Sequence, residues 1–445
     1  MSDKSLYHNE EKLRRDYIPA SDFTPEFHRL EMERVWPRVW QAACREEEIP
    51  NPGDYVNYEI GHESILVVRN DTGDIRAFHN VCPHRGRRLR DDARGNMKSI
   101  YCNYHAWSFN LDGKPTVILD RDDWQGCPAF SDDDLSLTKV KVGSWAGWVW
   151  INMDPDCEPL EEFLAPMAEK TSVFEWEKCR IRSYTTLIFP INWKVALEAF
   201  CEGYHATGTH PQLTKYGALY LPGTEDTLAD PGARHASHYG QFKFESIEEL
   251  GFSDAREYVA SNMLELHDTL HGIIHEAGAI AARRLLAEAP AGLTMLEAYE
   301  KFGALQKEEV LKSGAQWPER MQGHDLMITE WQVFPNCSIL PAAEGAFWYR
   351  ARPNGDDPNS CIFDVFSLGR YAPGKEPKVS QQIFHNLEDF KGHNPILEQD
   401  FSNMIAVHKG MRSRWWKGAR PSPVQESNVY NLHRVLHQYI YTDEK

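Results

Sequence analysis

The chain has 445 residues, 42% of them hydrophobic and 26% charged, a globular composition whose length favours two domains. Its net charge of −18 argues against nucleic acid as a partner. No apolar run approaches the roughly eighteen residues of a membrane span, and the polar N-terminus has no secretory signal, so a cytoplasmic protein is expected. The nine cysteines form no disulfide framework. Seven of them are interpreted as small apolar residues: Cys44, Cys127, Cys157, Cys179, Cys201, Cys337 and Cys361.

The first 40 residues are predicted to be mainly helical. Ser21 or Thr24 can cap a helix, Pro25 suits its first turn, and EFHRLEMERVW has an amphipathic pattern. Residues 41–155 are predicted to be all-β, because the strand patterns YVNYEI, SILVVRN and GWVWINM are separated by the turn signals NPGD, NDTGD and LDGK. Residues 153–166 resemble a linker that enters a helix.

Two short loops in the β region each carry one cysteine and one histidine, in the order CPHRG at 82–86 and CNYHAW at 102–107. A [2Fe–2S] centre with two Cys on one iron and two His on the other needs this supply. Cys82, His84, Cys102 and His105 are therefore predicted to hold a Rieske cluster. Structural zinc is the alternative, but zinc frameworks favour paired Cys followed by paired His.

A basic patch separates the two loops. Residues 85–98 carry five Arg and one Lys against two Asp. The patch is interpreted in two ways, as a solvated hairpin or as a docking surface that attracts an acidic electron donor.

The rest of the chain mixes strands and helices. Residues 182–193 are strand-like, 192–205 have helical spacing, and 254–313 are predicted to form two or three helices. WQVFPNCSILPA, AFWYRARP and CIFDVFSLGRY predict three antiparallel strands, with a turn at NGDDPN. Helices are predicted over 395–411 and 426–442, and helices on an antiparallel sheet make an α+β domain. The sequence has no Gly-rich nucleotide fingerprint, so NAD(P)H and flavin are expected on a separate protein.

A second candidate metal site follows the helical pattern at 192–205, in the order Glu202-x-x-His205-x-x-x-x-His210. Because residues three apart are neighbours on a helix, Glu202 and His205 are expected on one helix face. Two imidazoles and one carboxylate on one face of Fe(II) leave positions open for O₂ and substrate. A lone pair of histidines is a weak signal, but beside the Rieske pattern it predicts a mononuclear iron site.

The segment NWKVALEAFCEGYHATGTHP at 192–211, together with the two Rieske loops, strongly resembles the α subunits of the Rieske non-haem iron oxygenases. These are the aromatic-ring-hydroxylating dioxygenases and their relatives, and the resemblance covers most of the chain. It implies an α+β fold in three parts. N-terminal helices at 1–40 pack on a catalytic domain at 156–445, whose antiparallel sheet is covered by helices in a helix-grip arrangement, and an all-β Rieske domain occupies 41–155.

The resemblance also implies residue roles. His205 and His210 match the two iron-ligand histidines. The third ligand is expected in ILEQDFSN, where Asp400 matches the family position better than Glu398. Glu202 matches the carboxylate that links the Rieske cluster of one subunit, through His105 or His84, to the mononuclear iron of its neighbour.

Three positions depart from the common family pattern. Glu202 stands where most ring dioxygenases have Asp, and Glu occurs in some members that act on quaternary ammonium compounds. Ala199 stands where many members have Asn. His408 stands where Gln is common and is interpreted as a helix-surface residue.

Two further groups of residues are assigned from spacing. His267, His271 and His275 recur every four residues and are expected to share a polar or pocket-facing helix side. Six apolar residues are candidates for the wall of the substrate pocket, with core packing as the competing interpretation: Phe200, Leu213, Leu266, Leu270, Phe334 and Phe347.

The resemblance implies the terminal oxygenase of a multicomponent system. Electrons from NAD(P)H pass through a flavin reductase, with or without a ferredoxin, to the Rieske cluster and then to Fe(II), where O₂ hydroxylates an aromatic or polycyclic small molecule. The alternative within the family is a monooxygenase or N/O-demethylase, for example on a quaternary ammonium compound. The alternative outside it is an electron-transfer or structural metal protein. A homotrimer, with or without a β subunit, is expected.

Overall fold

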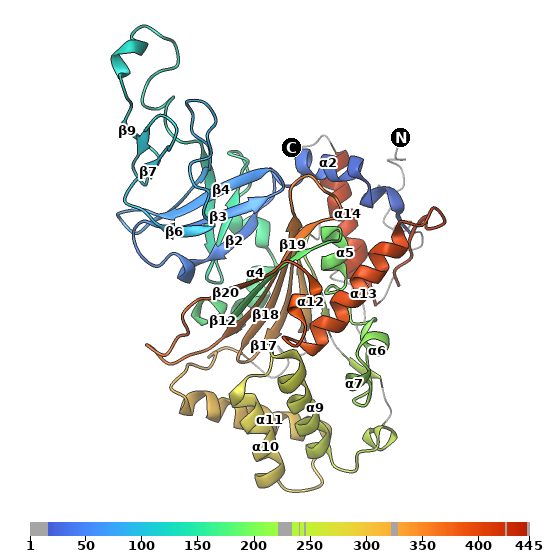
Figure 1. The fold of residues 1–445 in the computed structure, drawn as a ribbon. Helices are drawn as coiled ribbons and strands as arrows, with labels where there is room; N and C mark the ends of the chain where they lie inside the picture. Colours follow the sequence, from blue (N-terminus) through green and yellow to red (C-terminus); the bar gives the residue numbers. More distant parts are fainter. Residues whose placement is uncertain are drawn as a thin grey trace. The chain divides into compact units, whose positions relative to one another are not determined.

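The computed structural model describes residues 17–220, 234–239, 241–243, 246–321, 328–422 and 425–442 (Figure 1). The chain divides into two compact units, one of residues 32–165 and one that joins the segment up to residue 31 with the chain from 166 onward. The first unit is built on β-sheets and the second on a sheet with helices, so the predicted α+β class is confirmed. Within the described residues, no helix combines the length and the apolar character that a bilayer crossing needs.

The unit of residues 32–165 contains a seven-stranded antiparallel sheet in the order β2-β11-β10-β5-β4-β3-β6. The predicted patterns YVNYEI, SILVVRN and GWVWINM fall on β3, β4 and β11. The strands are β2 Gln41–Arg45, β3 Asp54–Ile60, β4 Glu63–Arg69, β5 Ile75–His79, β6 Arg94–Asn96, β10 Lys139–Trp145 and β11 Trp148–Asn152.

A small second sheet in this unit carries the loop of residues 102–107. It consists of β7 (Ile100–Tyr101), β8 (Ser108–Phe109) and β9 (Pro115–Val117). The core of the unit joins Phe78 and Trp107 to Cys82 and Cys102. Within the predicted linker at 153–166, α3 covers Leu160–Leu164.

The second unit contains a seven-stranded sheet in the order β14-β16-β17-β18-β19-β12-β20. The pairing is antiparallel except between β12 and β20. The strands are β12 Arg180–Phe189, β14 Ala236–Tyr239, β16 Ile328–Val333, β17 Cys337–Ala342, β18 Gly345–Pro353, β19 Cys361–Gly369 and β20 Gln381–Phe384. The unit also contains two separate two-stranded sheets, β1 (Ile18–Pro19) with β21 (Gly418–Ala419) and β13 (Ala218–Tyr220) with β15 (Gln241–Lys243).

The prediction of one strand over WQVFPNCSILPA is wrong. The segment forms two strands, β16 and β17, joined by a turn at 334–336. Pro335 stands in this turn, where it has no backbone N–H to give to a strand ladder. NGDDPN forms the turn between β18 and β19, as predicted.

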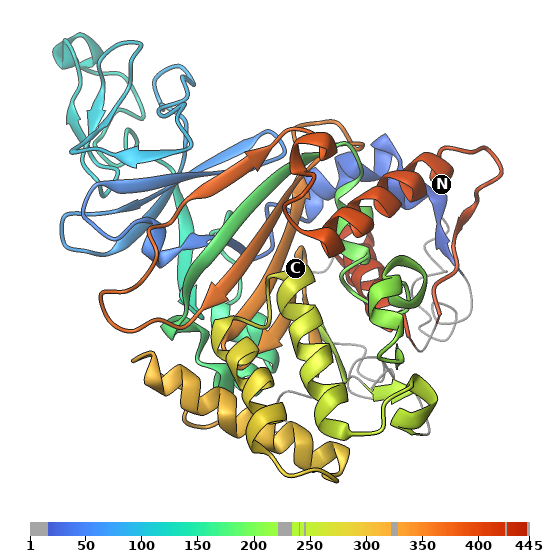
Figure 2. The same ribbon diagram turned by 60° about the horizontal axis from the view of Figure 1, so that its bottom comes forward.

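Three helices fill 254–313: α9 (Ala255–Leu270), α10 (Glu276–Glu288) and α11 (Met295–Lys312). They lie side by side (Figure 2) around a core that includes Tyr258 and Leu285. The predicted helix at 395–411 is α13 (Pro395–Met411), and α14 (Ser427–Tyr441) matches the prediction for 426–442. Near the N-terminus, η2 (Ala20–Phe23) and α2 (Pro25–Arg34) are described, and residues 1–16 lie outside the described part of the chain.

Short helices complete the unit. They are α4 (Met167–Thr171), α5 (Trp193–Glu198), α6 (Ala206–Thr209), α7 (Pro211–Thr214) and α12 (Leu387–Phe390). All but the last residue of α5 is buried, because this helix packs on β18 and β19 and is covered by α13 (Figure 1).

Several predictions for single residues are wrong. His267, His271 and His275 do not share a helix face, because they do not lie on one helix. The helix α9 ends at Leu270, and His271 follows it with a left-handed φ of 56°. His275 directly precedes α10. His408 is buried rather than on the helix surface. Cys127 is exposed and Cys157 is half-buried, whereas the other five cysteines assigned to apolar packing are buried.

Candidate metal centres

The two loops predicted to hold the Rieske cluster share one backbone conformation. In the first, Gly86 N donates to Cys82 O at 2.9 Å and Cys82 N donates to Arg87 O at 2.8 Å. In the second, Ala106 N donates to Cys102 O at 3.1 Å and Cys102 N donates to Trp107 O at 2.9 Å. Gly86 and Ala106, each four residues after its cysteine, both have positive φ, which turns each loop back on itself.

The thiols and imidazoles of these loops face different surroundings. Cys82 and Cys102 are buried in the core, where their thiol groups interact. His84 and His105 are half-buried, with ring centroids 4.5 Å apart, and His84 stacks on Trp107 at 4.6 Å. This is the donor distribution that a cluster with a thiolate-bound inner iron and an imidazole-bound outer iron requires.

The electrostatics of the loops agree with a bound cation. Burial, together with the adjacent Cys102 thiol, raises the pKa of Cys82 to about 11. The thiolate form that ligates metal therefore needs a positive charge beside it, which iron supplies. His105 Nδ1 is buried with no hydrogen-bond partner in the described part of the chain. Cys82, His84, Cys102 and His105 therefore fit a [2Fe–2S] cluster.

The basic patch of residues 85–98 is partly neutralised within its own unit. Arg87 pairs with Asp91 at 2.8 Å, Arg94 pairs with Glu48 at 3.3 Å, and Arg88 pairs with Glu59. Arg85 instead lies over the ring of Tyr104, which is 54% exposed and contacts His105. Arg85 and Tyr104 thus place one cation and one aromatic ring at the surface beside His105.

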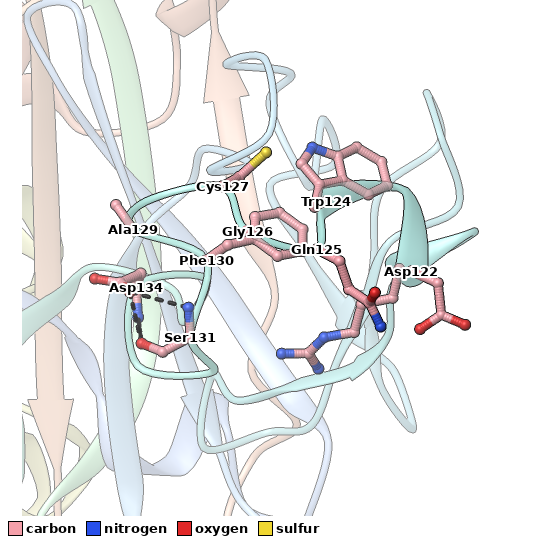
Figure 3. Close-up of a pocket in the computed structure, with 10 residues that line it drawn as sticks. Asp122, Trp124, Gln125, Gly126, Cys127, Ala129, Phe130, Ser131 and Asp134 are labelled. Atoms are coloured by element: carbon pink, nitrogen blue, oxygen red, sulfur yellow. Dashed lines mark hydrogen bonds between the residues drawn. The ribbon is translucent and has the colours of Figure 1, made fainter.

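A surface pocket of the same unit lies among residues 121–134 (Figure 3). Trp124 and Phe130 stack at 5.1 Å on one side, and Ser131 and Asp134 are hydrogen-bonded on the other. The Trp124 ring lies 6.3 Å from His84, so aromatic side chains connect this pocket to a predicted cluster ligand.

The segment that carries the second candidate site is less helical than predicted. Asn192 caps α5 by accepting a hydrogen bond from Lys194 N, but the helix ends at Glu198 instead of continuing to 205. Residues 199–205 form turns. Glu202 does meet His205, but not across a helical turn: its carboxylate accepts from His205 N at 2.9 Å and lies 2.7 Å from His205 Nδ1.

His205, His210 and Asp400 converge, with one ligand atom from each within 4.8 Å of the others. Asp400 Oδ1 lies 3.5 Å from His205 Nε2 and 3.0 Å from His210 Nε2. Glu398, the alternative carboxylate, instead accepts a hydrogen bond from Gly392 N. Two separate segments, 205–210 and α13, thus bring two imidazoles and a carboxylate together, which is the donor set of a facial iron triad.

The surroundings of the three side chains fit a metal ion. Asp400 Oδ1 is buried and has no hydrogen-bond partner among the described residues, although both imidazoles face it. Burial opposes protonation of His205, but Asp400 and Glu202 raise its pKa to about 10. Two carboxylates around one imidazole therefore create a strong preference for a cation at this point.

Sequence reasoning missed Gln399, the neighbour of Asp400. Its Oε1 lies 2.9 Å from His210 Nδ1 and accepts from Gln212 Nε2 at 2.9 Å. Gln399 thus holds His210 as Glu202 holds His205, because a hydrogen bond at the outer nitrogen sets the orientation of a ligand imidazole. In the sequence, only its position next to Asp400 could have indicated this role.

The candidate pocket residues have mixed surroundings. Phe200, Leu270, Phe334 and Phe347 are buried, whereas Leu213 and Leu266 are half-buried. Phe200 stacks on Tyr349 at 3.9 Å and on Phe363 at 5.3 Å. Phe200 therefore packs on the sheet, against β18 and β19.

Two family profiles match the chain. One, described as "Ring hydroxylating alpha subunit (catalytic domain)", matches residues 174–442, and the other, "Rieske [2Fe-2S] domain", matches residues 39–123. The chain belongs to the ring-hydroxylating α-subunit family. Its cofactors, a Rieske [2Fe–2S] cluster and a mononuclear iron, follow from these two domains.

Curated relatives within this family differ in what they act on. The chain is 32% identical over 225 residues to "Glycine betaine monooxygenase oxygenase subunit" of Chromohalobacter salexigens, covering 49% of each chain. It is 33% identical over 232 residues to "Salicylate 5-hydroxylase, large oxygenase component" of Ralstonia sp., covering 49% of this chain and 55% of that one. The chain spans about half the length of the curated relatives it matches.

Solved structures show the same fold over nearly the whole chain. The quaternary ammonium Rieske monooxygenase CntA in complex with L-carnitine has a TM-score of 0.62 at 19% identity, covering 95% of each chain. Naphthalene 1,2-dioxygenase from Rhodococcus sp. bound to indole has a TM-score of 0.65 at 18% identity, covering 100% of each chain.

Proposed function

We propose that this chain is the terminal oxygenase subunit of a multicomponent Rieske system, which hydroxylates a small organic substrate with O₂ and electrons from NAD(P)H. The observation that carries the proposal is the convergence of His205, His210 and Asp400 in a chain that also has the two Rieske loops. Electron storage and an open iron site in one protein are the two parts that oxygen activation needs.

Each residue set has one role in this proposal. Cys82, His84, Cys102 and His105 hold the cluster in a Rieske domain at 41–155. His205, His210 and Asp400 hold iron in a catalytic domain at 156–445. When bound, the iron supplies open coordination positions for O₂ and substrate. Glu202 orients His205 and serves as the bridge for electrons that arrive from a neighbouring subunit.

The first candidate substrate class is aromatic or polycyclic. The chain is similar to subunits named salicylate 5-hydroxylase and anthranilate 1,2-dioxygenase, which supports this class. Monooxygenation or demethylation of a quaternary ammonium compound is the second candidate. Two observations favour it: the glutamate at Glu202, and the similarity to glycine betaine and carnitine monooxygenase subunits.

A single turnover tests the activity and separates the two classes. The purified protein is reduced chemically and then given O₂ with a panel of arenes, aromatic acids and quaternary amines. Addition of two oxygen atoms to a ring means a dioxygenase, whereas one oxygen atom or loss of a methyl group means a monooxygenase or demethylase. No oxygenated product, with two irons per chain instead of three, rejects the proposal in favour of an electron-transfer protein.

The proposal includes partners: a ferredoxin or flavin reductase as donor, a homotrimer with or without a β subunit, and a cytoplasmic location. The cationic and aromatic surface formed by Arg85 and Tyr104 beside His105 supports docking of an acidic donor. The rate of cluster reduction by the donor is expected to fall as ionic strength rises. A rate that does not change with salt would refute electrostatic docking.

A further inference from the structure

A second cluster of ionisable side chains lies in the larger unit, away from the three proposed iron ligands. His433 and His437 stand one helical turn apart on α14, and both face Asp22 of η2. Asp22 Oδ2 lies 2.8 Å from His433 Nδ1 and 2.8 Å from His437 Nε2. The other ring nitrogen of His433, Nε2, lies 2.8 Å from Glu198 Oε1. Asp22 and His433 are fully buried.

The two hydrogen bonds of the His433 ring fix its charge. A carboxylate only accepts, so a ring nitrogen that bonds to a carboxylate must carry a proton. His433 makes such a contact through each of its two nitrogens. Its ring is therefore an imidazolium, held between Asp22 and Glu198.

Glu198 connects this cation to the proposed iron site. It is the last residue of α5, and the chain from 199 to 205 has neither helix nor strand to define its path. Side-chain contacts hold this stretch along its length. They include Glu198 to His433 at its start, Ser338 Oγ to Phe200 O at 2.5 Å, and Glu202 to His205 at its end. The geometry of Glu202 and His205 depends on these anchors.

Stability alone does not explain a buried ion cluster at this place. Apolar residues of similar volume often stabilise a core as well as a buried ion pair does, because both charges must first be removed from water. What a buried pair adds is a defined geometry, since the cost of leaving either charge unpaired is high. The end of α5 is a position where defined geometry matters.

Two histidines and an aspartate are also a possible metal donor set, and Asp22 Oδ1 has no hydrogen-bond partner among the described residues. Both imidazoles, however, approach the same oxygen at hydrogen-bond distance, and the second nitrogen of His433 is bonded as well. At the proposed iron site, the two imidazole nitrogens lie farther from the carboxylate oxygen that they face, at 3.5 and 3.0 Å from Asp400 Oδ1. The cluster at Asp22 is assembled around protons.

We propose that His433 is a positioning residue for the oxygenase site: as a buried imidazolium between Asp22 and Glu198, it fixes the end of α5 and thereby the turn that places Glu202 and His205. This inference rests on the proposed function. Asp22 holds the His433 ring in place and is itself bonded to His437, one turn further along α14.

The test uses the full-length protein loaded with both metal centres. His433→Gln removes the imidazolium, and Glu198→Leu removes its partner on α5, because leucine is of similar size but accepts no hydrogen bond. The double variant removes both partners. His28→Gln is the matched control, because His28 is a buried imidazole on α2 whose Nδ1 lies 3.9 Å from Glu31, beyond hydrogen-bond range. The readouts are mononuclear iron retained against a chelator, the nitric oxide spectrum of that iron, the Rieske absorbance and the melting temperature.

Both single variants are expected to release mononuclear iron at about tenfold lower chelator concentration, with an altered nitric oxide spectrum and unchanged Rieske absorbance. The double variant should be no worse than either single one, because both remove one shared contact. His28→Gln should match wild type in iron retention. A variant that only loses melting temperature, with iron retention and spectrum unchanged, overturns the proposal.

The remaining outcomes are also decisive. If His433→Gln fails to fold, Glu198→Leu decides alone, because it leaves the pair of Asp22 and His433 in place. A further metal besides iron, present in wild type and lost in Asp22→Asn, would replace the imidazolium with a metal site and overturn the proposal. If wild type contains only two irons per chain, the oxygenase function itself is rejected. If wild type contains three irons and every variant retains them, only the role of His433 is rejected.

Discussion

Each imidazole that faces Asp400 is held through its other nitrogen by a side-chain oxygen, from Glu202 for His205 and from Gln399 for His210. The Glu202 and Gln399 side chains differ in charge. A carboxylate stabilises positive charge on its imidazole, whereas an amide oxygen only orients the ring. At the scale of single residues, the site is therefore asymmetric, with its more basic ligand on the side of the proposed electron bridge.

The choice of Asp400 as third ligand predicts a specific loss. Asp400→Ala is expected to reduce the iron content from three to two per chain, because the remaining pair of imidazoles offers too few donors to retain Fe(II). The Rieske absorbance should be unchanged. Glu398→Ala, two positions away on α13, is the control and should keep three irons. Iron analysis with the visible spectrum checks both variants, and full iron in Asp400→Ala would move the ligand role to another carboxylate.

The bridging role of Glu202 predicts a kinetic defect without metal loss. Glu202→Gln keeps the size of the side chain but removes its charge, so turnover is expected to fall by about 10- to 100-fold, the usual effect of an outer-shell partner. Both metals should remain bound. Stopped-flow oxidation of the reduced Rieske cluster in the presence of O₂ and substrate measures the rate at which electrons leave the cluster. Wild-type rates in this variant would exclude the bridge.

At the scale of elements, the site is made of short pieces held by long-range contacts. Four residues make up each of α6 and α7, and six make up α5. Helices this short are not stable by themselves. They are held by α13, from which Gln399 and Asp400 reach His210 and Asn403 donates to Thr209 Oγ1 at 3.0 Å. Changes in the packing of α13 should therefore affect the site.

Two glycines in neighbouring helices predict opposite stability effects. A Cβ at Gly278, near the start of α10, would lie 2.7 Å from Glu344 Oε1 and 2.8 Å from Ile274 Cγ2, so Gly278→Ala should destabilise by about 1–3 kcal/mol. A Cβ at Gly303, inside α11, would meet nothing within 4 Å. Gly303→Ala should stabilise by about 0.5–1 kcal/mol, because alanine loses less backbone entropy in a helix. Urea unfolding measures both, and a stabilised Gly278→Ala would contradict the packing around Glu344.

The docking of α14 predicts a pH dependence. Burial disfavours protonation of His433, but its hydrogen bonds to Asp22 and Glu198 raise its pKa to about 9. A histidine in the unfolded chain has a pKa of about 6.5. The stability that protonated His433 adds to the fold is therefore complete below that pH, and it is lost as the pH rises through the pKa of His433 in the folded protein. The other ionisable groups around it are His437, the pair of Glu31 and Lys194 behind Asp22, and Glu426 near Glu198.

Melting temperatures of wild type and His433→Gln, measured from slightly acidic to alkaline pH, check this dependence. The difference between the two proteins should be largest below about pH 6.5 and should shrink as the pH passes about 9. His28→Gln corrects for the loss of a buried imidazole. A difference that stays constant over this range would mean that His433 carries no proton in the folded state.

At the scale of the whole molecule, the proposed electron path crosses between subunits. Two inactive variants should then complement each other: Cys102→Ser, which lacks the cluster, and Asp400→Ala, which lacks the mononuclear iron. In a ring assembled at random from equal amounts, one interface in four pairs an intact cluster with an intact iron, so about a quarter of wild-type turnover is expected. Turnover of co-expressed, purified mixtures measures it. No recovery in mixed rings would place the path within one chain.

The sequence by itself determined the two ligand loops, the histidine pair and most helices and strands. These features are local: the spacing of Cys82 and His84, or the sequence of Thr24 and Pro25 at the start of α2, involves only a few neighbouring residues. The choice of Asp400 over Glu398 came from family resemblance, and the structure places Asp400 beside both histidines.

Only the tertiary structure decided where α5 ends, that Gln399 holds His210, and that His433 reaches Glu198. The helical spacing of 192–205 could not show that the chain leaves the helix at Glu198, because the partners that hold the turn come from other elements. Gln399 lies 189 residues from His210, and His433 lies 235 residues from Glu198. Such contacts depend on how sheets and helices pack in three dimensions, and a local pattern carries no information about that packing.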